Sequence, residues 1–180
     1  MKNQNTKRLA YAALFLALCL VLPMLTGQIP QIGSMLLPMH IPVLLCGLVC
    51  GWQYGAVVGF VAPLLRSVLF GMPPMYPVAI AMAFELLTYG LVIGLVYRRL
   101  AQKGLVGVYA ALVTAMVAGR LVWGVAEVVL LGLGGKAFTA QAFLAGALLN
   151  AVPGIIVQLV LIPAVMAALQ KAGAVKEYAE

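Results

Sequence analysis

Charged side chains are scarce in this sequence, and aspartate is missing altogether. Only 8% of its 180 residues are charged, whereas soluble globular domains carry about 25%. Residues 9–65 and 137–170 contain no charged side chain, and 65% of the chain is hydrophobic. Because an apolar helix of about 20 residues crosses a bilayer, these long uncharged runs predict an all-α membrane protein that crosses the membrane several times.

Other scarcities exclude several classes of function. Three cysteines in apolar surroundings and one histidine are too few for a disulfide framework or a zinc site, so Cys19, Cys46 and Cys50 are predicted to pack inside the protein. No phosphate-binding Gly-Lys-Ser/Thr sequence or serine nucleophile elbow is present. We therefore expect no catalytic residues, cofactor or metal. The net charge of +7 comes without a basic run longer than two residues, so nucleic acid is not an expected partner.

Glycine, proline and charge divide the chain into six predicted spans in a single integral membrane domain, residues 1–180. Lysine and arginine then predict the orientation, because cytoplasmic loops are enriched in them. Eight fall on the side of the two termini and only Lys136 on the other, so both termini are predicted to be cytoplasmic. The predicted helices cover residues 7–25, 42–50, 55–70, 78–98, 105–131 and 140–171, and a long outer loop covers residues 26–41.

Four ionisable side chains remain inside the predicted spans, namely Arg66, Glu85, Arg120 and Glu127. Each costs about 3 kcal/mol at the bilayer centre, so each needs a partner or a polar cavity. At a rise of about 1.5 Å per residue, all four fall in the central to outer half of the membrane. His40 ends the outer loop on the same side. This convergence predicts a pocket for a small polar molecule that opens to the outside.

Helical periodicity adds further candidates to this predicted pocket. Arg120, Trp123 and Glu127 share one face of the fifth predicted helix, and Thr88 and Tyr89 follow the glutamate of the fourth on its polar face. In the sixth predicted helix, the amides Asn150 and Gln158 flank Pro153-Gly154, where a loosened backbone could expose carbonyl groups. The predicted substrate-binding residues are His40, Arg66, Glu85, Thr88, Tyr89, Arg120, Trp123, Glu127 and Asn150.

A purely structural interpretation stands beside this one. Arg66 with Glu85, and Arg120 with Glu127, could form closed ion pairs that hold helices together in a subunit that binds no ligand. His40 could equally bond a neighbouring carbonyl group.

Small residues on the first predicted helix suggest a contact with another protein. Ala10, Ala13 and Ala17 recur at i, i+3 and i+7, which leaves a flat face that a second helix can approach closely.

A set of short motifs runs along the chain. These motifs are His40-Ile-Pro-Val-Leu-Leu, Gly51-Trp-Gln-Tyr-Gly55, Pro63-Leu-Leu-Arg-Ser67, Gly71-Met-Pro-Pro74, Ala81-Met-Ala-Phe-Glu85 and Tyr89-Gly90. With these motifs, the number of predicted helices, the alanine face and the long first loop, the chain resembles the substrate-binding S components of energy-coupling factor (ECF) vitamin transporters, in particular the pantothenate-type branch.

The resemblance implies a vitamin-binding subunit of the prokaryotic cell membrane that is not itself an enzyme. Substrate would bind near the outer surface under the first loop. The matching residues here are His40, Glu85, Tyr89, Arg120, Trp123, Glu127 and Asn150. The alanine motif Ala13-Leu-Phe-Leu-Ala17 would dock on the transmembrane coupling subunit T, and two separate ATPase subunits would supply energy. The S component would tip over in the membrane to release its cargo.

The chemistry of the residues leaves the vitamin open between two candidates. For pantothenate, Arg120 or Arg66 could bind the carboxylate, while Asn150, Thr88 and Tyr89 suit the hydroxyl and amide groups. If Glu85 and Glu127 neutralise both arginines, a neutral vitamin such as pyridoxine fits better.

Overall fold

The computed structural model describes residues 2–25, 35–135, 139–146 and 150–173, which form helices and turns and contain no strand. The all-α prediction is confirmed for these residues. Five helices are long and apolar enough to cross a membrane, whereas α3 (His40–Cys50) is apolar but shorter. The long helices are α1 (Lys2–Leu25), α4 (Trp52–Phe70), α5 (Ile80–Leu100), α6 (Leu105–Leu133) and α8 (Val152–Lys171).

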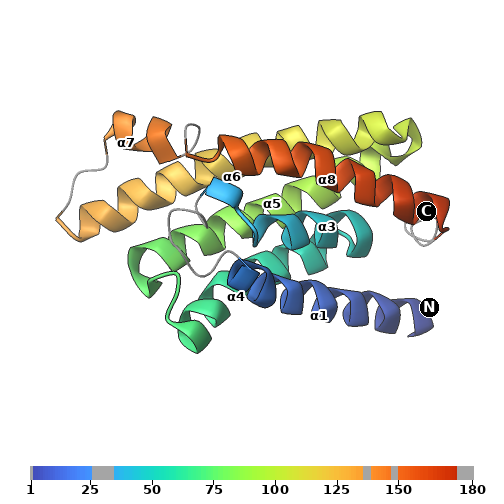
Figure 1. Cartoon of the computed structure of the whole chain (residues 1–180), viewed down its shortest axis with the longest axis horizontal. Coiled ribbons are helices and arrows are strands. Elements are labelled where there is room, and N and C mark those ends of the chain that lie inside the picture. The colour runs from blue at the N-terminus through green and yellow to red at the C-terminus, as the bar shows by residue number, and fades with distance from the viewer. Residues whose placement is uncertain (1, 26–34, 136–138, 147–149, 174–180) are drawn as a thin grey trace.

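The short helix α3 forms the centre of the bundle. Ten of its eleven residues are buried, and it packs against α1, α4, α5 and α8. In Figure 1, α1 lies on one side of α3 and α8 on the other. Glycines permit the close packing, since a Cβ atom at Gly47 or Gly55 would lie 2.8 Å from the carbonyl oxygen of Gly90 on α5. The cysteines at 19, 46 and 50 are free and buried, as predicted.

Helix α1 lies at the edge of the bundle, where it contacts α3 and α4 (Figure 1). Its Ala12 and Cys19 side chains are buried against these helices. By contrast, Ala10, Ala13 and Ala17 are exposed. The alanine face predicted from the sequence therefore points away from the rest of the described chain.

Two of the differences between the predicted and the observed helices concern the candidate site residues. The short helix begins at His40 rather than at residue 42, so His40 is the first residue of α3 and not the end of a loop. The prediction of one helix over residues 140–171 is also wrong, because α7 (Ala140–Leu144) and α8 are separated by a turn at residues 150–151. Pro153 lies in the first turn of α8, where proline is favoured because the N–H that it lacks would have no partner within the helix.

The predicted orientation rests partly on residues outside the described ranges. Lys136 and most of the predicted outer loop, residues 26–34, lie outside them. The beginning of α1 and the end of α8 lie at the same end of the bundle (Figure 1). Six membrane crossings with both termini in the cytoplasm stay a prediction.

Candidate functional site

Glu85 on α5 lies at the centre of a buried polar cluster and is only 1% exposed. Its Oε1 atom is 2.9 Å from Nη1 of Arg120 on α6 and 3.5 Å from Nε2 of His40 on α3. One turn further along α5, the ring of Tyr89 contacts His40 edge to face, with 5.3 Å between the ring centroids. Three helices thus bring a carboxylate, a guanidinium, an imidazole and a phenol together inside an apolar bundle.

The backbone around the cluster explains how these side chains meet. A Cβ atom at Gly119 would overlap the ring of Tyr89, so the absence of a side chain lets this ring pack directly on α6 beside Arg120. His40 is positioned by a tight turn, in which its N–H donates to the carbonyl of Leu37 at 3.0 Å. Leu37 has a φ of 51°, a left-handed conformation that is uncommon for residues other than glycine.

The cluster leaves several buried polar atoms without a hydrogen-bond partner among the described residues. They are both imidazole nitrogens of His40, Oε1 of Glu85, and Nε and Nη2 of Arg120. The contacts of Glu85 Oε1 are therefore at ion-pair distance without hydrogen-bond geometry. An unsatisfied buried polar group costs about 1–3 kcal/mol, so this concentration of donors suits a ligand that carries hydrogen-bond acceptors.

The polar face of α6 continues beyond Arg120. Glu127, two turns later on the same face of α6, is 6% exposed. Between these levels the indole of Trp123 stacks on Phe143 of α7, with 6.1 Å between centroids and 26° between planes. The arrangement along α6 is a cation, an aromatic ring and a carboxylate, as the spacing in the sequence predicts.

Three predicted site residues lie elsewhere. Arg66 donates from Nη1 to the carbonyl of Leu20 on α1, and its guanidinium carbon lies 5.2 Å from the ring centroid of Phe70. The hydroxyl of Thr88 donates to the carbonyl of Phe84 at 2.8 Å. Asn150 is exposed in the turn before α8.

Neither ion pair of the structural interpretation is formed among the described residues, because Glu85 contacts Arg120 instead of Arg66. Arg66 instead faces α1, where it donates to the carbonyl of Leu20, three residues before Pro23. Gln158, which the sequence singles out with Asn150 but which is not among the predicted substrate-binding residues, is buried on α8.

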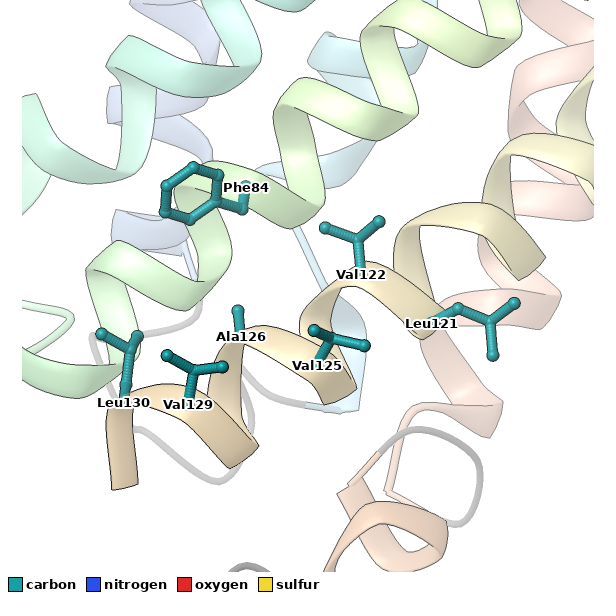
Figure 2. Close-up of a pocket in the computed structure, with 7 residues that line it drawn as sticks. All are labelled: Phe84, Leu121, Val122, Val125, Ala126, Val129 and Leu130. Atoms are coloured by element: carbon teal, nitrogen blue, oxygen red, sulfur yellow. The ribbon is translucent and has the colours of Figure 1, made fainter. Parts of the chain in front are cut away.

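A separate pocket of about 400 Å³ lies between α5 and α6. Figure 2 shows Phe84 of α5 facing a row of α6 side chains across it. The lining is entirely apolar, and it consists of Phe84, Leu121, Val122, Val125, Ala126, Val129 and Leu130. It contains none of the clustered polar residues, so it suits a lipid acyl chain better than a polar molecule.

Comparison with protein families decides the identity. The model of the family "ECF transporter, substrate-specific component" matches residues 7–167. The chain belongs to this family. It is therefore the S component of an ECF transporter, a transport subunit rather than an enzyme, and a multi-pass integral protein of the cell membrane. Its family partners are a small-molecule substrate, the T subunit and the ATPase subunits. No match was found among curated proteins or among solved structures.

Proposed function

We propose that this S component captures pantothenate and that the substrate binds at the His40, Glu85, Tyr89 and Arg120 cluster. The observation that carries the proposal is the state of the Arg120 guanidinium. Its Nη1 atom contacts Glu85, whereas Nε and Nη2 have no partner among the described residues. These two N–H groups form one edge of the guanidinium, and such an edge binds a carboxylate in a bidentate manner.

The other groups of the cluster fit the rest of the molecule. Pantothenate carries an amide and two hydroxyl groups, which can bond the unpartnered nitrogens of His40. Its gem-dimethyl group needs an apolar surface, and the stacked Trp123 and Phe143 offer one.

Pyridoxine is the second candidate, and the contact between Glu85 and Arg120 favours it. This ion pair cancels the charge of the guanidinium, so a neutral vitamin would enter without adding an unpaired charge. A subunit without any ligand is disfavoured, because a closed structural cluster would satisfy its buried donors with protein groups, as most native interiors do.

The alanine face of α1 is proposed to dock on the T subunit. Its three alanines are exposed, and small side chains let two membrane helices approach closely. Two ATPase subunits would then drive release of the vitamin into the cytoplasm, with the S component tipping in the membrane.

Calorimetric titration of the detergent-purified protein tests the substrate. Mass spectrometry first establishes whether a ligand has copurified, and pantothenate and pyridoxine are then titrated into the emptied protein. Pantothenate should bind, and Arg120→Gln should weaken this binding by roughly 10- to 100-fold, the equivalent of a lost hydrogen-bonded charge pair.

Arg66→Gln is the matched control, because Arg66 is also a buried arginine but lies against α1. It should leave the affinity unchanged. Binding of pyridoxine alone would overturn pantothenate as the substrate, and a folded, empty protein that binds no vitamin would overturn the binding site.

A further inference from the structure

The short helix α7 is held against α6 by the ring of Phe143. This ring stacks on Trp123, and a Cβ atom at Gly124 would overlap it. In return, a Cβ atom at Gly146, two residues after α7, would lie 2.8 Å from Cη2 of Trp123. Each ring therefore lies in the space that a glycine of the other segment leaves open, and this is how α7 can lie directly on α6.

The other described side chains of α7 add little to this attachment. The helix has five residues, Gln141 is exposed, and Leu144 is 50% exposed. A helix of this length is not stable by itself in water, and segments with few buried contacts open at a low cost in free energy. The position of α7 therefore depends on Phe143, and loss of this contact would allow the helix to move away from α6.

The contact lies beside the most accessible member of the polar cluster. The side chains of His40 and Glu85 are each 2% exposed, whereas that of Arg120 is 13% exposed. The two α6 residues that Phe143 contacts follow Arg120 by three and four positions, so they are its neighbours on the helix surface. They lie toward the end of the bundle that is opposite both termini, where Figure 1 shows α7. A molecule that approaches Arg120 from that end must pass α7.

We propose that α7 is a lid over the polar cluster and that Phe143 is the side chain that closes it beside Arg120. This inference rests on the proposed function, since it takes the cluster as the substrate site. In the closed state Phe143 stacks on Trp123, as the structure shows. In the open state the ring leaves Gly124 and the substrate reaches the open edge of the guanidinium. Closing then excludes water from the bound substrate.

A lid and a fixed wall make different kinetic predictions. If α7 is a lid, the substrate enters only the open fraction of the protein, so the apparent association rate constant is proportional to that fraction. Weakening the closed state then raises the association and the dissociation rate constants together. If α7 is a fixed wall, loss of the Phe143 ring removes an apolar contact with the substrate and raises the dissociation rate constant alone. The association rate constant therefore decides between them.

The test measures the binding and release of radiolabelled pantothenate by the detergent-purified full-length protein. Phe143→Ala removes the ring, whereas Gly124→Ala displaces it without removing it. Each substitution should raise both rate constants by roughly 2- to 10-fold, as expected for the loss of one aromatic pair. Leu144→Ala is the matched control on α7, because this side chain is half exposed, and it should leave both rate constants at the wild-type values.

The outcomes separate this inference from the proposed function. Tight pantothenate binding with an unchanged association rate constant in Phe143→Ala and Gly124→Ala would overturn the lid and leave the substrate in place. Equal changes in Leu144→Ala would overturn the role of Phe143. If Phe143→Ala does not fold, the association rate constant of Gly124→Ala decides by itself. Failure of the wild type to bind pantothenate would overturn the proposed function and this inference with it.

Discussion

The substitution Gly119→Ala should damage the site without touching any of its polar atoms. The added Cβ atom would lie 3.0 Å from Cζ of Tyr89 and closer still to Cδ1 and Cε1, so the ring must move. Because Tyr89 packs edge to face against His40, its displacement separates α5 from α6 and disturbs the cluster around Glu85.

The size of this effect follows from packing. Overpacking a close contact costs about 1–3 kcal/mol, whereas replacing glycine by alanine in a helix contributes about 1 kcal/mol of stabilisation. The net effect on the free energy of unfolding is a loss of up to about 2 kcal/mol. The affinity for the vitamin should fall by at least tenfold, because a displaced site must be rebuilt when the ligand binds.

Gly132→Ala is the matched control on the same helix, since a Cβ atom there would meet nothing within 4 Å. It should leave affinity unchanged and raise stability slightly. Thermal unfolding in detergent and calorimetric titration measure both quantities. Unchanged stability and affinity in Gly119→Ala would refute the close approach of α5 and α6 at this point.

Three further predictions concern other parts of the molecule. The double substitution Ala13→Trp with Ala17→Trp should abolish vitamin uptake by the assembled transporter but spare binding by the isolated subunit; preserved uptake would contradict docking through this face. Arg66→Met should lower the free energy of unfolding by about 1 kcal/mol, because the carbonyl of Leu20 loses its donor, and thermal unfolding measures it; a loss of vitamin binding would instead return Arg66 to the site. Trp123→Ala should weaken binding by roughly tenfold through loss of an aromatic surface, as titration would show, and equal affinity would place the ligand away from α6.

The family assignment gives a reason for charged side chains inside the bundle. An S component takes its substrate from water into a membrane protein, so its site needs polar groups at a depth where each is costly. The described residues concentrate these groups at one junction of α3, α5 and α6. The apolar pocket between α5 and α6 offers no such groups, which is why we assign the vitamin to the polar cluster.

The membrane class and the helical faces followed from the sequence alone. Long uncharged runs are compatible with few structures other than apolar helices in lipid. Within one helix the positions of side chains depend only on local geometry, so the shared face of Arg120, Trp123 and Glu127 could be predicted from their spacing.

The partners of the charges were decided only by the tertiary structure. From their depth in the membrane, Arg66 and Arg120 were equally good candidates to contact Glu85. In the structure, Arg66 faces α1 and Arg120 contacts the carboxylate, because of how each helix is rotated and packed. Spacing along the chain contains no information about these rotations. They depend on which helix surfaces fit closely, as Gly119 does against the ring of Tyr89, and this fit exists only when the whole bundle has formed.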